Sequence, residues 1–186
     1  HQAKQFIDFG NWTLLGKTLE RVKASIFDTP IISTNLKYLK QVKQHLKKYK
    51  IKKFKIVLEP AKRNTAPAIL STALIKDIPN KQPLMFLAAD HLIEKVSLFN
   101  KAIKKNQSKL TQNNIFIFGI KPTMPSSEFG YFLTKNSRVT RFIEKPKETK
   151  AKQIIRKKGY WNSGMFYLRK DSIINNFKKY QPNIYR

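Results

Sequence analysis

The chain has 186 residues, 41% of them hydrophobic, which is enough to bury a core, and a single domain over 1–186 is expected. No segment approaches the roughly 20 uncharged apolar residues of a membrane span, and the N-terminal HQAKQFIDFG lacks the apolar region of a signal peptide. The sequence contains no cysteine, which excludes disulfides and thiolate metal sites and favours a reducing, cytoplasmic location.

Lysine and arginine number 38 against 11 aspartates and glutamates, which gives a formal net charge of +27. This charge predicts either a polyanionic partner, such as nucleic acid or an anionic membrane, or a compositional bias in which lysine fills solvent-facing helix positions. The lysines are spread over nearly every helical pattern and form no single dense basic arm. We therefore favour the compositional bias and expect neither nucleic acid nor membrane as a partner.

The first half of the chain alternates helical and extended patterns. Apolar residues recur with a period near 3.6 in 12–26 and 36–49, which predicts two amphipathic helices, and Asn35 is placed to cap the second. FKIVLEP predicts a strand, and Pro67 is tolerable in the next helix only in its first turn. The elements expected here are a helix at 12–26, a short apolar run at 30–35, a helix at 36–49, a strand at 54–60 and a helix at 65–78.

The second half continues this alternation and then becomes richer in strands. LMFLAAD predicts a strand buried on both faces, and two β-rich runs around KNSR predict a hairpin-like pair. The elements expected are strands at 84–90, 114–120, 129–134, 139–145 and 162–169, and helices at 94–108, 147–158 and 171–180. Strands that alternate with helices indicate βαβ units, so we predict an α/β fold: a mostly parallel sheet with helices on both faces and a small antiparallel section.

Three of the scarce acids directly follow apolar strands: Glu59, Asp90 and Glu144. Ligands of open α/β sheets bind beyond the carboxyl ends of the strands, so these carboxylates are expected at a ligand-binding edge. Asp90 suits Mg²⁺ as an oxygen ligand, but an ordinary turn or cap residue gives the same pattern, and spacing alone does not separate the two. His91 beside it is interpreted as structural rather than as a ligand or base.

Two other stretches also allow a functional and a structural interpretation. In FIEKP, Lys145 can meet a phosphate and Glu144 can accept hydrogen bonds from hydroxyls, although a solvated pair before a proline turn gives the same pattern. In VLEPAKRNTAPAI, the free N–H groups of a helix start suit a phosphate or a base carbonyl, and a well-capped helix alone also explains them.

Taken in order, EPAKRNTAPAI, LAADH, FGIKPTMPSSEFGYF, FIEKP and YWNSGMF resemble the mannose-1-phosphate guanylyltransferases, within the sugar-1-phosphate nucleotidyltransferases. The resemblance covers almost all of residues 4–186 and implies a Rossmann-like nucleotidyltransferase fold. It also implies an enzyme that joins GTP and mannose-1-phosphate into GDP-mannose with release of pyrophosphate, using Mg²⁺ as cofactor. The partners implied are these two substrates, and a homodimer is left open.

The functional positions of the family carry over motif by motif. Asp90 matches the metal-binding aspartate that bridges the ion to the nucleotide α-phosphate and the sugar phosphate, and Lys145 matches the lysine that holds the sugar phosphate. Lys4, in AKQF, matches the lysine that closes the nucleotide-binding signature, so the resemblance implies three catalytic residues. The implied nucleotide-binding positions are Glu59, Asn64 and Thr65, and the implied sugar-binding positions are Gly130, Glu144, Lys145 and Asn162.

The sequence departs from the family pattern at several points. The glycine-rich loop that wraps the triphosphate has no counterpart among the six glycines, and the second metal-binding aspartate is expected beyond residue 186. Glu128 and Phe129 stand where glycine and tyrosine are usual. We therefore expect an incomplete catalytic domain with little or no activity alone. Two alternatives stay open: a non-catalytic sugar-nucleotide-binding or regulatory relative, and a basic protein that binds polyanions.

Overall fold

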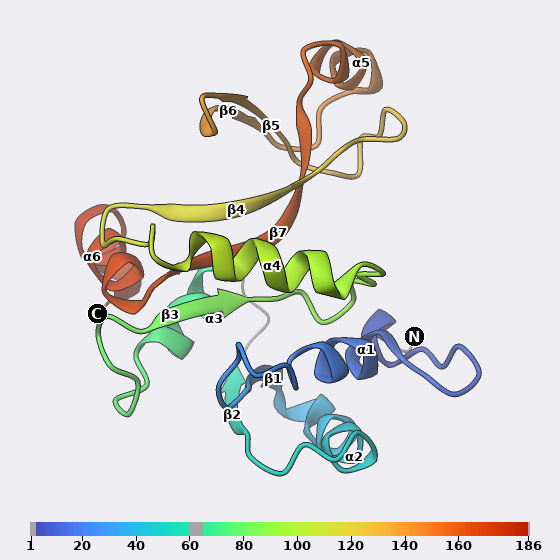
Figure 1. The fold of residues 1–186 in the computed structure, drawn as a ribbon, viewed down its shortest axis with the longest axis vertical. Coiled ribbons are helices and arrows are strands. Elements are labelled where there is room, and N and C mark those ends of the chain that lie inside the picture. Colours follow the sequence, from blue (N-terminus) through green and yellow to red (C-terminus); the bar gives the residue numbers. More distant parts are fainter. Residues whose placement is uncertain (1–2, 60–64, 186) are drawn as a thin grey trace. The chain divides into compact units, whose positions relative to one another are not determined.

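The computed structural model describes residues 3–59 and 65–185. The chain divides into two compact units, of which unit 1 comprises His1–Ile115 with Leu168–Arg186, and unit 2 comprises Phe116–Tyr167. Helices and strands alternate along the chain (Figure 1), which confirms the predicted α/β class. In the part of the chain that the structure describes, no helix is both long and apolar enough to span a membrane.

Unit 1 contains most of the helices. Thr13 caps the first α-helix, since its Oγ1 accepts a hydrogen bond from the Gly16 N–H at 3.0 Å. The 3₁₀ turns (η), helices and strands of this unit are η1 (Lys4–Phe6), α1 (Leu14–Arg21), β1 (Ile31–Asn35), η2 (Leu36–Tyr38), α2 (Leu39–Lys48), β2 (Lys55–Glu59), α3 (Thr65–Ala73), β3 (Pro83–Phe86), α4 (Val96–Gln107), α6 (Lys170–Tyr180) and α7 (Pro182–Tyr185).

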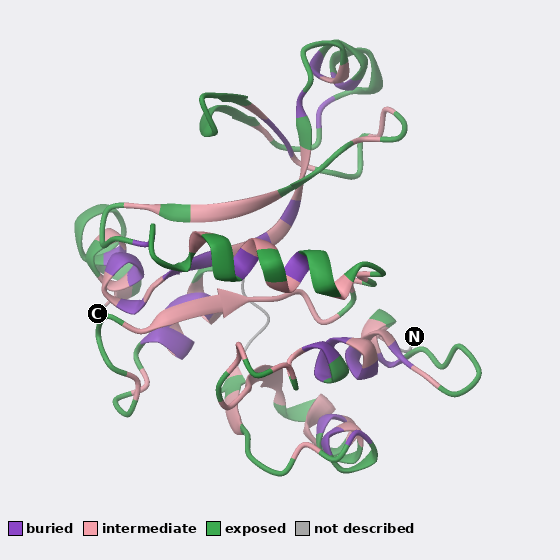
Figure 2. Ribbon diagram, viewed as in Figure 1, coloured by how far each residue is buried: buried purple, intermediate pink, exposed green. Residues whose placement is uncertain are grey.

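The amphipathic helices α1 and α2 pack through one apolar cluster, visible as buried segments in Figure 2. A Cβ added at Gly16 would lie 2.1 Å from the Tyr49 ring, so α1 can approach the end of α2 this closely only with glycine there. The cluster also receives Ile32 of β1 and Ile56 of β2. Its buried members are Phe6, Leu15, Leu19, Val42, Leu46 and Tyr49.

Helix α3 ends at Ala73, earlier than the predicted limit of residue 78. In a longer helix the Ile75 carbonyl would accept a hydrogen bond from the N–H of residue 79, but Pro79 has none. The buried ammonium of Lys170, from α6, donates instead to the carbonyl oxygens of Ile75 at 2.8 Å and Ile78 at 2.6 Å. Pro67 lies in the first turn of α3, as predicted.

The strand predicted at 84–90 is also shorter than expected. β3 ends at Phe86, and its residues are half-buried rather than buried on both faces. Ala88, Ala89 and Asp90 belong to residue types that are depleted in strands, and residues 89–90 form a turn. The prediction that Asp90 terminates a strand is therefore wrong, although it does follow β3 closely.

Unit 2 contains the hairpin that the sequence predicts. β5 (Tyr131–Lys135) and β6 (Arg138–Ile143) pair antiparallel through a two-residue turn at Asn136 and Ser137. Both turn residues have positive φ, 51° and 60°, which matches the twist of the two strands. The other elements are β4 (Ile115–Ile120), which begins at the last residue of the first segment of unit 1, α5 (Glu148–Arg156), and β7 (Tyr160–Arg169), which ends in unit 1.

Candidate functional site

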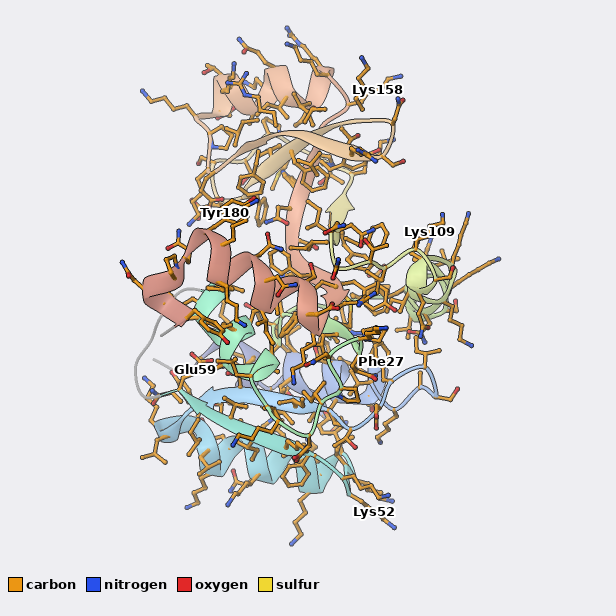
Figure 3. All side chains as sticks on the ribbon, turned by 90° about the vertical axis from the view of Figure 1, so that its left-hand side faces the viewer. Phe27, Lys52, Glu59, Lys109, Lys158 and Tyr180 are labelled. Atoms are coloured by element: carbon orange, nitrogen blue, oxygen red, sulfur yellow. The ribbon has the colours of Figure 1, made fainter. Side chains whose placement is uncertain are left out.

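The carboxylate at the end of β2 is held by β1. The two strands are parallel, with Asn35 opposite Glu59 at their carboxyl ends. Ser33 Oγ donates a hydrogen bond to Glu59 Oε1 at 2.5 Å, and Asn35 Nδ2 donates to the Glu59 carbonyl oxygen at 3.2 Å. Asn35 Oδ1 also accepts from the Lys37 N–H, so it caps η2 as predicted. Glu59, labelled in Figure 3, is thus a half-buried acid fixed at the strand edge.

The other predicted nucleotide-binding residues have simpler surroundings. Thr65 is the exposed first residue of α3, and Asn64 lies outside the described residues. Lys4 is the first residue of the 3₁₀ turn η1 and its side chain is exposed. The side chains of Thr65 and Lys4 are therefore exposed to solvent, where a ligand can reach them, whereas Glu59 is already positioned by protein contacts.

Asp90 lies in a turn beyond β3, with its carboxylate open to solvent. Its Oδ1 is 4.0 Å from His91 Nε2, and the Asp90 and His91 side chains are 45% and 37% exposed. Among the described residues, no group of three or more His, Cys, Asp or Glu side chains is placed to hold a metal ion. Mg²⁺ needs only one or two carboxylates when substrate phosphates supply the other oxygens. Asp90 therefore fits a cation held largely by its substrate, and does not fit a protein-only metal centre.

Three of the predicted sugar-binding residues lie together in unit 2. The Asn162 N–H donates a hydrogen bond to the Gly130 carbonyl oxygen at 2.7 Å. A Cβ added at Gly130 would lie 2.8 Å from Glu144 Oε2 and 3.7 Å from Asn162 Cβ. The backbone of Gly130 therefore lies directly against the Glu144 carboxylate, and a larger residue would take the space that this carboxylate now occupies.

Strand register explains why these three residues meet. Tyr131, at the start of β5, is opposite Ile143 of β6 and opposite Trp161 of β7. Both pairings are antiparallel, so the residue before Tyr131 faces the residues that follow Ile143 and Trp161. Those residues are Gly130, Glu144 and Asn162.

Lys145 follows Glu144 and has an unusual backbone conformation. Its φ is +39°, in the left-handed region that costs a residue with a Cβ about 1–2 kcal/mol. Its side chain is exposed, whereas the following Pro146 is buried. Lys50, Asn136, Ser137 and Lys158 also have positive φ and lie in turns, so this conformation marks the bend of the chain before Pro146.

Aromatic residues adjoin Gly130 and Asn162 in the sequence. The sequence patterns alone did not identify all of them as candidate site residues. The ring of Phe129 packs on Trp161 at 4.8 Å between centroids. The hydroxyl of buried Tyr131 donates to the Ser126 carbonyl at 3.1 Å and accepts from its N–H at 3.0 Å, which fixes the loop before β5. Trp161 Nε1 is buried without a partner in the described structure. Tyr131 and Ser33 were missed because each is an ordinary strand residue until the register is known.

The whole chain matches one known protein family. The model of the nucleotidyl transferase family matches residues 1–186. The chain belongs to the nucleotidyl transferase family. AlgA, an alginate biosynthesis protein of Pseudomonas fluorescens, is 35% identical over 193 residues, covering 98% of this chain and 40% of AlgA. A mannose-1-phosphate guanylyltransferase of Klebsiella pneumoniae is 33% identical over 193 residues, covering 97% of this chain and 41% of the relative.

Solved structures agree on the fold of this nucleotidyl transferase. A Helicobacter pylori structure described as a mannose-6-phosphate isomerase has a TM-score of 0.87 at 32% identity, covering 97% of this chain and 71% of that one. A Thermus thermophilus structure described as a mannose-1-phosphate geranyltransferase has a TM-score of 0.79 at 26% identity, covering 95% and 53%. These likenesses confirm the Rossmann-like nucleotidyltransferase fold. The chain spans about two fifths of the length of the curated relatives it matches.

Within this nucleotidyl transferase, the residues implied by the resemblance fall into two sets. Unit 1 carries Lys4, Glu59, Thr65 and Asp90, and unit 2 carries Gly130, Glu144, Lys145 and Asn162. In unit 2 the structure brings Glu144 and Asn162 against Gly130, and in unit 1 it fixes Glu59 while leaving Asp90 exposed.

Proposed function

We propose that the protein containing this chain transfers GMP from GTP to mannose-1-phosphate, giving GDP-mannose and pyrophosphate. The observation that carries the proposal is the convergence of Gly130, Glu144 and Asn162. Three separate motifs supply these residues, and their meeting places the Glu144 carboxylate, which is suited to accept hydrogen bonds from sugar hydroxyls, against the Gly130 backbone. Relatives named mannose-1-phosphate guanylyltransferase match nearly the whole chain and support the choice of sugar and nucleotide.

We assign the nucleotide to residues of unit 1. The fixed carboxylate of Glu59 is suited to accept hydrogen bonds from the N–H groups of guanine, and Asn64 and Thr65 follow it in the same segment. Lys4 supplies a positive charge for the triphosphate. A cytoplasmic location, where GTP is available, agrees with this assignment and with the absence of cysteine from the sequence.

In the proposed reaction the main task of the protein is to position two anions, GTP and mannose-1-phosphate. An oxygen of the sugar phosphate attacks the α-phosphorus of GTP in line, and pyrophosphate leaves. This oxygen is already ionised, so no general base is needed, and Lys145 offsets the repulsion between the two phosphates. We propose Asp90 as the carboxylate that would hold Mg²⁺, which as a bound cation would neutralise charge on the phosphates.

Replacing Gly130 by alanine is expected to weaken mannose-1-phosphate binding about tenfold. The new Cβ would lie 2.8 Å from Glu144 Oε2 and 3.1 Å from Phe142 Cζ, so the Glu144 carboxylate must shift away from residue 130. A displaced carboxylate loses hydrogen bonds to the sugar, each worth roughly tenfold or more in affinity when a charged group takes part. Calorimetric titration measures this affinity, and an unchanged value would show that sugar binding does not depend on the present position of the Glu144 carboxylate.

Steady-state kinetics with a panel of substrates test the proposed reaction. The protein, with any flanking residues that its gene encodes, is assayed for pyrophosphate release from GTP, ATP, UTP and dTTP, each with mannose-1-phosphate and glucose-1-phosphate. We expect the highest kcat/KM for GTP with mannose-1-phosphate. Faster turnover of another pair would reassign the substrates. Binding of both ligands without turnover of any pair would instead identify a non-catalytic sugar-nucleotide-binding relative.

A further inference from the structure

Two side chains near the carboxyl end of β1 donate hydrogen bonds to the same residue of β2, Glu59. Ser33 Oγ donates to the Glu59 side chain at Oε1, and Asn35 Nδ2 donates to the Glu59 backbone carbonyl. The side chain and the backbone of Glu59 are therefore both tied to the neighbouring strand. The pairing of β1 with β2 does not depend on either of these side-chain contacts, because the two backbones already pair from Ile31 to Asn35.

The parallel register makes the Ser33 contact specific to one face of the sheet. Ser33 is opposite Val57, and side chains alternate between faces along a strand, so Ser33 and Glu59 are diagonal neighbours on the same face. Thr34, the next residue of β1, lies on the opposite face. Only the hydroxyl of Ser33 is thus in register to reach the Glu59 carboxylate, while the hydroxyl of Thr34 is not.

One donated hydrogen bond restricts the movement of a carboxylate but occupies only one of its acceptor positions. An ionised carboxylate has about four acceptor positions, and Ser33 occupies one of those on Oε1. Among the described residues no other group donates to this carboxylate, so Oε2 and the second position on Oε1 can accept from a ligand. A glutamate held in this way has already lost much of its rotamer freedom, so a ligand that binds it loses less entropy than with a mobile side chain.

We propose that Ser33 is a positioning residue for base recognition: it holds Glu59 so that the carboxylate accepts two adjacent N–H donors from the edge of a purine base. This inference rests on the proposed function, in which Glu59 contacts guanine. Guanine presents such a pair of donors, at N1 and at its 2-amino group, whereas the corresponding edge of adenine offers an acceptor at N1. A positioned Glu59 therefore favours GTP over ATP, and Ser33 sharpens that preference.

A matched pair of variants tests the role of the hydroxyl alone. Ser33→Thr keeps a hydroxyl on a β-branched side chain, and Ser33→Val has nearly the same shape and good strand propensity without the hydroxyl. Titration calorimetry with GTP and with ATP gives the affinity ratio for wild type and each variant. We expect Ser33→Val to weaken GTP binding about tenfold with ATP binding nearly unchanged, and Ser33→Thr to keep a ratio within about threefold of wild type.

Two further variants separate the outcomes. Thr34→Val removes a hydroxyl from the opposite face of β1 and is expected to leave the ratio unchanged, and melting temperatures establish that each variant is folded. If Glu59→Gln abolishes the preference for GTP while Ser33→Val retains it, the role of Ser33 is wrong and the proposed role of Glu59 stands. If Glu59→Gln leaves the preference intact, Glu59 does not read the base, and the inference fails together with that part of the proposed function.

Discussion

Replacing Lys170 by methionine is expected to lower the free energy of unfolding by about 3 kcal/mol. Lys170 is only 5% exposed, and its ammonium donates to the carbonyl oxygens of Ile75 and Ile78. Methionine leaves both carbonyls without this donor, at a cost of roughly 1–3 kcal/mol each, and part of that cost is offset because no charge is buried. Chemical denaturation followed by far-UV circular dichroism measures the difference.

Lys179→Met is the matched control for this prediction. Lys179 is on the same helix, α6, and its side chain is exposed, so its replacement is expected to change the stability by less than about 0.5 kcal/mol. A Lys170→Met variant as stable as Lys179→Met would show that the segment between α3 and β3 does not depend on Lys170. Backbone hydrogen bonds from Lys170 to Gln82 and from Asp171 to Asn80 hold the same segment.

Replacing Asp90 by asparagine is expected to reduce kcat of the proposed reaction about a thousandfold. An amide oxygen is a much weaker ligand for a divalent cation than a carboxylate, and the described residues offer no cluster of acids that could take its place. The melting temperature is expected to stay within about 2 °C, because the Asp90 side chain is 45% exposed and lies in a turn. Initial rates at saturating substrate give kcat.

Asp77→Asn is the control for the Asp90 variant. Asp77 is another exposed acid of unit 1, and its hydrogen bond and ion pair with Lys55, at 2.9 Å, lower its pKa. It has no proposed contact with substrate, so turnover is expected to stay within about twofold of wild type. A kcat for Asp90→Asn within tenfold of wild type would remove Asp90 from the proposed cation site and leave it as a turn residue.

Local sequence patterns predicted most of the elements because each depends on neighbouring residues. The period of apolar residues located α1 and α2, including the buried Val42 and Leu46, and the turn around KNSR located the β5–β6 hairpin. The cap at Asn35 follows from the side-chain chemistry of a single residue. These features need no knowledge of the partners that lie far away in the sequence.

Some of the features that the sequence patterns missed depend on long-range partners. The early end of α3 involves Lys170, more than 90 residues away, and the hydrogen bond that fixes Glu59 depends on the register between β1 and β2. No local pattern distinguishes Ser33 from any other polar strand residue. The motifs did place Gly130, Glu144 and Asn162 in one site, but only the pairing of β5 with both β6 and β7 explains how they meet.

The central claim is that unit 1 binds the nucleotide and unit 2 binds the sugar phosphate. The most direct test is calorimetric titration of two single variants, each with GTP and with mannose-1-phosphate. Glu59→Gln in unit 1 is expected to weaken GTP binding about tenfold and to leave mannose-1-phosphate binding within about twofold. Gly130→Ala in unit 2 is expected to do the reverse. If each variant weakens both ligands equally, or if neither variant affects either ligand, the division of substrates between the two units is wrong.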